Sequence, residues 1–169
     1  MKKIKVRELS YEAFNKFGAY APLTDPFDLE ATGPKDAEIV FFRDPLLQDL
    51  GGAPAAFSTC RVSPRPFRVT DAEFHNGTCE TAIPLDGDVV VWFAPATADE
   101  TFPIDKVEAF RVPQGYAVMC RPGVWHYAAF PTGDKPVNVL IVLPERTYVN
   151  DVVVAKLPKD RQFEIAYKK

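Results

Sequence analysis

Short apolar stretches separated by turn residues run through most of this chain and predict β-strands. Between residues 2 and 9 charged and apolar side chains alternate, with Ile4 and Val6 on one face, as in a half-buried strand. Ser10 can cap a single short helix over residues 11–17, which ends at Gly18. The following segment, residues 21–36, is rich in Pro, Asp, Thr and Gly and is expected to be a loop.

The rest of the chain is predicted to consist of strands and turns. A surface excursion is expected at residues 45–54, and strands at residues 39–43, 57–62, 66–70, 81–85, 88–93, 108–112, 116–120, 125–130, 137–143, 152–157 and 163–165. Asp86-Gly87 predicts a two-residue hairpin, because both central positions of such a turn favour positive φ. Many short strands and little helix predict an all-β sandwich or barrel.

Composition narrows the class of protein further. The chain has 169 residues, of which 47% are hydrophobic and 25% charged, so it can bury a core as one domain. Its net charge of −3 gives no reason to expect binding to nucleic acid or to an anionic membrane. The three cysteines lack a Cys-x-x-Cys spacing, and neither a signal peptide nor a membrane span is evident. We therefore expect a soluble cytoplasmic protein.

The candidate chemistry lies in two short segments that hold the only two histidines, His75 and His126. Side chains two positions apart on a strand share a face, so Glu73 and His75 should point the same way. If Glu80 and His126 join them in the mouth of a small barrel, two imidazoles and two carboxylates converge. That set suits a divalent cation such as Mn, Fe, Ni or Zn, and the same groups can act as general acids and bases.

The spacing of these residues resembles the two signature motifs of the cupin superfamily. The order is Glu73-x-His75-x4-Glu80-x6-Gly87, followed by Gly123-x-x-His126. Glu73 replaces the usual first histidine, and the proline of the second motif is displaced to Pro122. The resemblance implies one cupin domain over residues 1–169, a jelly-roll-like double-stranded β-helix barrel with a metal or substrate site inside. We expect an N-terminal strand-helix extension at about 1–36, the barrel core at about 37–145 and C-terminal strands at about 146–169.

A closer resemblance is to the ureidoglycolate lyase (ureidoglycolate hydrolase) family. The similar segments are Leu9-Ser-Tyr-Glu-Ala-Phe-Asn-Lys-Phe-Gly18, Glu73-Phe-His75, Ala82-Ile-Pro-Leu85 and Val124-Trp-His126. The resemblance implies a lyase that releases urea from ureidoglycolate and forms glyoxylate in purine (allantoin) degradation.

The chemistry of that substrate suggests roles for particular residues. A base must remove the hydroxyl proton and an acid must protonate the departing nitrogen, for which His75 or Glu73 and His126 respectively are candidates. A cation or an arginine must hold the substrate carboxylate, and the candidates are Arg61, Arg65, Arg68 and Arg121. Trp125 is a candidate for the pocket wall, and Tyr127 for a neighbouring hydrogen bond.

Two departures from the lyase pattern favour a metal. Glu80 stands where the lyases usually have Gln, and Tyr127 stands where they commonly have a second histidine. A second carboxylate facing an anionic substrate is repulsive unless it is protonated or bound to a cation. We therefore expect a metal site formed by His75, Glu80, His126 and Glu73, holding Zn, Mn, Ni or Fe, and no organic cofactor.

Two alternatives remain open at this point. One is a metal-dependent cupin such as a sugar isomerase or a different lyase, and the other is a non-catalytic cupin that binds a small ligand. In each case we expect a homodimer, because pairing removes exposed strand edges, with the N-terminal strand and helix as the contact.

Overall fold

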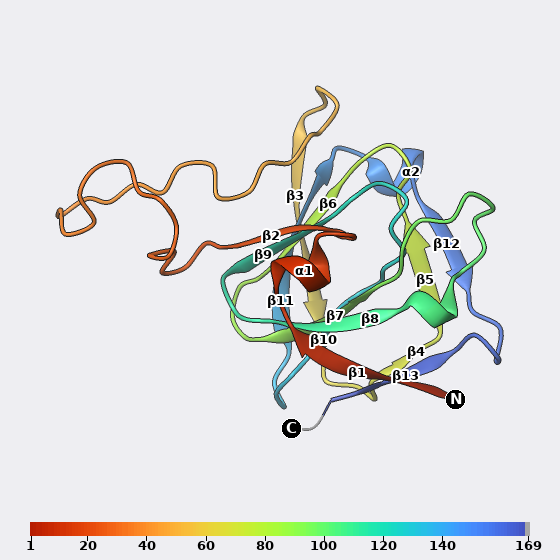
Figure 1. Ribbon diagram of the computed structural model, residues 1–169. Helices are drawn as coiled ribbons and strands as arrows, with labels where there is room; N and C mark the ends of the chain where they lie inside the picture. The colour runs from red at the N-terminus through yellow and green to blue at the C-terminus, as the bar shows by residue number, and fades with distance from the viewer. Residues whose placement is uncertain (168–169) are drawn as a thin grey trace.

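Two curled β-sheets face each other in the computed structural model, which describes residues 1–167 (Figure 1). The five-stranded sheet has the order β2 (Gly18–Pro22), β9 (Tyr116–Cys120), β6 (Glu80–Pro84), β11 (Val137–Pro144) and β3 (Ala55–Val62). The six-stranded sheet has the order β10 (Phe130–Pro131), β7 (Val89–Phe93), β8 (Glu108–Val112), β1 (Lys2–Glu8), β13 (Phe163–Ala166) and β4 (Arg68–Val69). A separate pair joins β5 (Asp71–Phe74) to β12 (Val153–Lys156). The predicted all-β fold is confirmed.

The space between the two sheets holds the main apolar core. Every second residue of β11, beginning at Val137, is buried, and the intervening ones are half-buried. Because β11 pairs along its whole length with β3 and also with β6, this strand lies inside the five-stranded sheet. Each fully buried aliphatic side chain of this kind stabilises the fold by about 1.5–3 kcal/mol.

Strand β7 is apolar throughout because both of its faces are covered. Val91 and Phe93 pack in the core between the sheets. Val90 and Trp92 point to the opposite face, into a second cluster with Phe163. This alternation makes β7 a partition between two regions of the interior.

The predicted helix forms but is shorter than expected. It spans α1 (Tyr11–Phe14), and the Ser10 hydroxyl caps it by accepting a hydrogen bond from the Ala13 N–H at 3.3 Å. Gly18 does not simply end the helix, since it begins strand β2 and pairs with Cys120. A Cβ added at Gly18 would lie 1.7 Å from the Met119 carbonyl oxygen, so this close pairing requires glycine.

The hairpin predicted at Asp86-Gly87 is wrong. β6 pairs with β9 and β11, whereas β7 pairs with β8 and β10, so this turn carries the chain from one sheet to the other. Gly87 does not adopt positive φ. The Asp86 carboxylate instead accepts a hydrogen bond from the Asn138 N–H at 2.7 Å, which fixes the crossing against β11.

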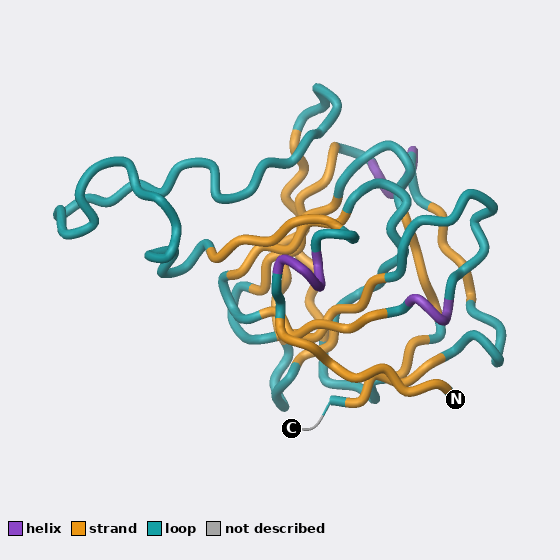
Figure 2. The backbone as a smooth tube through the Cα atoms, in the orientation of Figure 1, coloured by secondary structure: helices purple, strands orange, loops and turns teal. Residues whose placement is uncertain are grey.

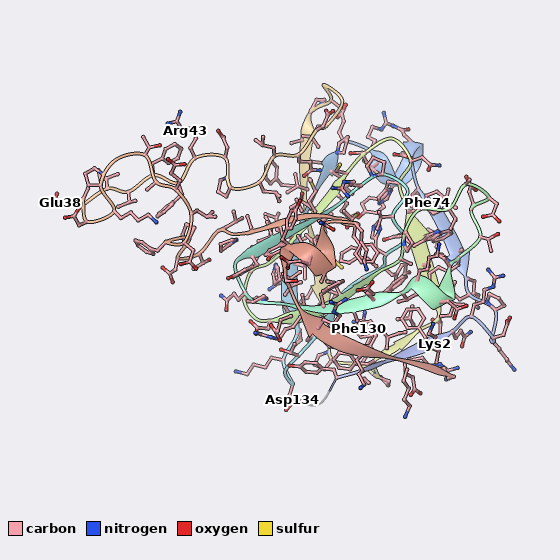
Figure 3. The ribbon with its side chains drawn as sticks, in the orientation of Figure 1. Lys2, Glu38, Arg43, Phe74, Phe130 and Asp134 are labelled. Carbon is pink, nitrogen blue, oxygen red and sulfur yellow. The ribbon has the colours of Figure 1, made fainter. Side chains whose placement is uncertain are left out.

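The strand predicted at residues 39–43 is also wrong. Residues 23–54 form a long irregular segment that extends away from the barrel (Figures 1 and 2), and its outer part carries Glu38 and Arg43 (Figure 3). Its only β contact among the described residues is an isolated bridge between Thr32 and Phe41. Ile39 is 88% exposed, since no neighbouring strand completes a ladder there.

Smaller differences concern short elements. The strand predicted over residues 125–130 is reduced to isolated bridges at Trp125 and His126 followed by β10. A second helix, α2 (Thr147–Asn150), and a 3₁₀ turn, η1 (Ile104–Lys106), were not predicted. β1 lies between β8 and β13 in the six-stranded sheet, and the division of the domain into extension, core and C-terminal strands stays a prediction. No helix within residues 1–167 has the length and apolar character needed to cross a membrane.

Candidate functional site

His75, Glu80 and His126 converge at one buried point of the barrel. The Glu80 Oε2 atom lies 3.1 Å from His75 Nε2 and 3.3 Å from His126 Nε2. One nitrogen or oxygen atom from each of the three side chains lies within 4.8 Å of the others. The sequence-based expectation that the two histidine segments meet is therefore realised in the geometry.

Backbone hydrogen bonds hold the two segments together. The Glu73 N–H donates to the His126 carbonyl at 2.8 Å, and the His126 N–H donates to the Glu73 carbonyl at 2.9 Å. The Gly123 N–H donates to the His75 carbonyl at 2.6 Å. Gly123 has a φ of 75°, a conformation that glycine adopts without strain, so the Pro122-Gly123 turn is what returns the chain to His75.

The partners of each Nδ1 atom define how the two imidazoles are protonated. His75 Nδ1 lies 2.5 Å from the Asp151 carbonyl oxygen, and His126 Nδ1 lies 2.8 Å from the Val124 carbonyl oxygen. A carbonyl oxygen only accepts, so each Nδ1 carries a proton. In the neutral ring the Nε2 lone pair then faces Glu80, an arrangement typical of histidines that bind a metal through Nε2.

His75, Glu80 and His126, referred to below as the triad, change one another's pKa values. Burial alone would raise the pKa of Glu80, but the neighbouring His126 and His75 outweigh it and lower that pKa to about 2. Burial alone would lower the pKa of His126, but Cys120 and Glu80 outweigh it and raise that pKa well above its ordinary value. Burial is likewise outweighed at His75, where hydrogen bonds to Glu80 and Asp151 raise the pKa. A buried carboxylate held in this way is ionised at neutral pH.

A cavity of about 260 Å³ opens beside the triad, between the two sheets. Most of its wall is apolar, with Val91 and Phe93 on one sheet and Val118, Val139 and Ile141 on the other. The polar lining residues are Glu73, Glu80, His126, Tyr127, Tyr148, Cys60 and Cys120.

Glu73 lines this cavity without belonging to the three-residue cluster. Burial is the main influence on its carboxyl group, and it raises the pKa of Glu73 despite the opposing influence of His126. A carboxyl group with a raised pKa beside a metal-type triad is suited to accepting and returning a proton.

Three lining residues were not singled out as site residues from the sequence. Tyr148 comes from the unpredicted helix α2, its ring centroid lies 6.0 Å from that of His75, and burial raises its pKa. Cys120 lies with its Sγ 3.8 Å from His126 Nδ1. Cys60 could have been found, because it lies two positions before Val62 and shares the inward face of β3 with it.

None of the four candidate arginines lines this cavity. Arg65 donates to the carbonyls of Ala128 and Ala129 at 3.0 and 2.8 Å, and Arg68 donates to Gln162 at 2.9 Å. Arg121 donates to the Asn15 carbonyl, and Arg61 alternates with Cys60 on β3.

The two aromatic candidates lie in different surroundings. Tyr127 lines the cavity and is 38% exposed. Trp125 is buried against Phe74, with their ring centroids 4.5 Å apart. It belongs to the second apolar cluster, with Trp92 and Phe163, and does not line the cavity.

Solved structures with a similar fold include a dTDP sugar isomerase from Desulfovibrio desulfuricans G20, which is 15% identical with a TM-score of 0.49. That similarity covers 86% of this chain and 87% of the other. A mutant oxalate decarboxylase from Bacillus subtilis is 17% identical with a TM-score of 0.45, covering 63% of this chain and 25% of that one. This chain thus spans about a quarter of those decarboxylase chains.

No curated protein matches the chain. The model of one protein family, described as ureidoglycolate lyase, matches residues 1–164. That match runs through both histidine segments and both sheets, and on this evidence the chain belongs to the ureidoglycolate lyase family, as its sequence predicted.

Proposed function

We propose that this protein is a metal-assisted lyase that cleaves ureidoglycolate to glyoxylate and urea. The observation that carries the proposal is the convergence of His75, Glu80 and His126 beside a cavity, in a chain of this family. In the reaction the carbon–nitrogen bond breaks, the substrate hydroxyl loses its proton to become the aldehyde oxygen of glyoxylate, and the departing nitrogen gains a proton to complete urea.

The residues of the triad fit a divalent cation. Two imidazole Nε2 atoms and one carboxylate form a two-histidine, one-carboxylate donor set, which suits Fe or Mn and is also compatible with Ni and Zn. Such an ion would act as a Lewis acid toward the substrate carboxylate and the developing carbonyl oxygen. The absence of any arginine from the cavity wall supports this assignment, because the anionic substrate needs a positive partner there.

Glu73 is the residue best suited to move the proton. Both histidines direct Nε2 at Glu80 and Nδ1 at a backbone carbonyl, so neither ring keeps a nitrogen free for the substrate. Glu73 takes the hydroxyl proton as the carbonyl forms and returns it to the leaving nitrogen. Tyr148 lies on the same cavity and orients the ureido group by a hydrogen bond.

The first test measures glyoxylate release from racemic ureidoglycolate by the purified protein, with and without a chelator. We expect turnover that falls on chelation and recovers with one of Mn, Fe, Ni or Zn. His126→Ala should abolish it, and Arg61→Gln, a change outside the cavity, should not. Folded protein that makes no glyoxylate with any of the four metals would overturn the substrate assignment.

The apolar cavity wall favours a second candidate function. Apart from the polar groups near the triad, the lining is Val, Ile, Phe and Ala. Such a wall suits a small carboxylate with an apolar substituent, so a metal-dependent cupin lyase or isomerase of another substrate is the alternative. It predicts metal-dependent turnover of such acids by protein that leaves ureidoglycolate intact.

We also propose a homodimer in the cytoplasm, within purine degradation. All three cysteines are free thiols, which supports a reducing compartment. β1 is already paired with β8 and β13, so it offers no free edge for a dimer contact. We place the contact in the segment 23–54 instead, because its apolar side chains Ile39, Phe41 and Leu47 are 88%, 62% and 73% exposed. Ile39→Asp combined with Phe41→Asp should yield monomer in analytical ultracentrifugation, and an unchanged sedimentation coefficient would contradict this contact.

A further inference from the structure

A second cavity, of about 230 Å³, lies next to the catalytic one. Tyr127 and Ala128 line both cavities and form the wall between them. β7 separates them as well, since Val91 and Phe93 face the catalytic cavity and Trp92 lines the second one. Unlike the first cavity, the second contains neither histidine nor Glu80.

Trp92 brings an unused hydrogen-bond donor to this region. The side chain is fully buried, and its Nε1 is the only buried side-chain nitrogen or oxygen within residues 1–167 that has no hydrogen-bond partner. Indole N–H can only donate, so it needs an acceptor. Buried donors are almost always satisfied in folded proteins, which points to an acceptor from outside the chain.

Two arginines add positive charge that is not balanced by an ion pair. Arg65 and Arg68 both line the cavity, and neither guanidinium lies within 4.0 Å of a carboxylate in the described part of the chain. Arg65 donates hydrogen bonds to the backbone carbonyls of Ser63, Ala128 and Ala129. Its guanidinium lies over the Phe130 ring, 4.0 Å from the ring centroid. Arg68 makes one bond, to Gln162, which leaves further N–H groups on its guanidinium.

One acidic side chain limits the charge of the cavity. Asp71 also lines it, and its carboxylate accepts a hydrogen bond from the Thr70 hydroxyl at 2.6 Å. Two guanidinium groups and one carboxylate give this cavity a net charge of +1. A singly charged ligand balances that charge, and a planar carboxylate matches the fork of a guanidinium.

We propose that this second cavity binds a small monocarboxylate anion. Arg68 and the Trp92 Nε1–H donate to the carboxylate, and Arg65 balances its charge while holding the shared wall at Ala128 and Ala129. The site is distinct from the metal-type triad and does not depend on the reaction carried out there.

Nuclear magnetic resonance of the ¹⁵N-labelled full-length protein tests this directly. The chain has two tryptophans and therefore two indole N–H signals, which Trp92→Phe assigns. Acetate is titrated against chloride at equal ionic strength. We expect the Trp92 signal to move with acetate and saturate, while the Trp125 signal, whose Nε1 donates to Thr97, stays in place.

Three variants separate this site from its surroundings. Arg68→Gln should weaken acetate binding about tenfold, because a charge-assisted hydrogen bond is lost. Arg61→Gln, another arginine outside the cavity, and Glu80→Gln, in the triad, should leave the titration midpoint unchanged. A Trp92 signal that does not respond to acetate would overturn the proposal, as would an equal midpoint in wild type and Arg68→Gln.

Discussion

Glu73 and His126 exchange two backbone hydrogen bonds, one of 2.8 Å from the Glu73 N–H and one of 2.9 Å from the His126 N–H. This isolated bridge joins two segments that are far apart in sequence and aligns the side chains on either side of it. The position of the triad therefore depends on backbone pairing and on the Pro122-Gly123 turn. Substitutions of the triad side chains should therefore alter the chemistry of the site without changing the backbone arrangement around it.

The turn itself can be tested with a pair of glycine substitutions. Gly123 has a φ of 75°, and a Cβ there would lie 2.9 Å from the Ala96 Cβ, so Gly123→Ala should lower the free energy of unfolding by about 1–3 kcal/mol. Gly133 has open space around it, and Gly133→Ala should change stability by less than about 0.5 kcal/mol. Urea denaturation measures both. Equal stabilities of the two variants would contradict the role given to this turn.

The convergence of the triad was predictable because the motifs contain both the ligands and the turns that return them. His75 and Glu80 flank one bend, and His126 follows a glycine with positive φ. The site's other polar residues gave weaker signals. Tyr148 lies in a short helix that begins at Arg146, a non-glycine residue with a φ of 60°, and no local pattern connects that turn to the cavity.

Strand pairing was less predictable than strand location. The short apolar stretches located the strands at residues 81–85 and 88–93 well, but such a stretch carries no information on the partner of a strand. The neighbours of β6 and β7 are set by long-range packing, and Val139 and Val91 belong to the same core cluster between the sheets. Residues 39–43 show the reverse case, since their apolar side chains formed no strand without a neighbour to pair with.

The stability of the metal-free protein should depend on pH in two directions. The folded pKa of Glu80 is about 2, below its ordinary 4.5, so this carboxylate contributes stability above about pH 4.5 that is lost as the pH falls toward 2. The pKa of His126 is raised above 6.5, so its contribution is complete below about pH 6.5 and is lost as the pH rises through the folded value. Maximum stability should therefore lie between about pH 4.5 and 6.5.

Chemical denaturation of chelator-treated protein across pH measures this profile. Glu80→Gln is the matched control because it keeps the shape of the side chain and removes its charge. The variant should show a flatter profile on both sides of the maximum. Profiles of the same shape in wild type and variant would show that the triad is not the source of the pH dependence.

The core between the sheets can be probed at Leu143, which is 3% exposed on β11. Leu143→Ala should lower the free energy of unfolding by about 2–5 kcal/mol, from lost burial and the void left behind. Val149 in α2 is 76% exposed, so Val149→Ala should change stability by less than about 0.5 kcal/mol. Thermal and urea denaturation of both variants measure this difference, and similar losses in the two would contradict the assigned core.

Glu73 provides the sharpest distinction between proton transfer and metal binding. Glu73→Gln keeps the size of the side chain but removes its ability to accept a proton, so kcat should fall by about 10²–10⁴-fold. Because Glu73 lies outside the cluster of His75, Glu80 and His126, metal content should remain at the wild-type level.

Steady-state kinetics together with elemental analysis of the purified variant check both parts of this expectation. Glu38→Gln, at the far end of the extended segment, is a matched control that should leave kcat and metal content unchanged (Figure 3). If Glu73→Gln loses its metal, Glu73 is a fourth ligand and the proton must move through another group. If it retains both metal and full activity, Glu73 has no role in the proton transfer, and Tyr148, which also lines the cavity, becomes the next residue to test in that role.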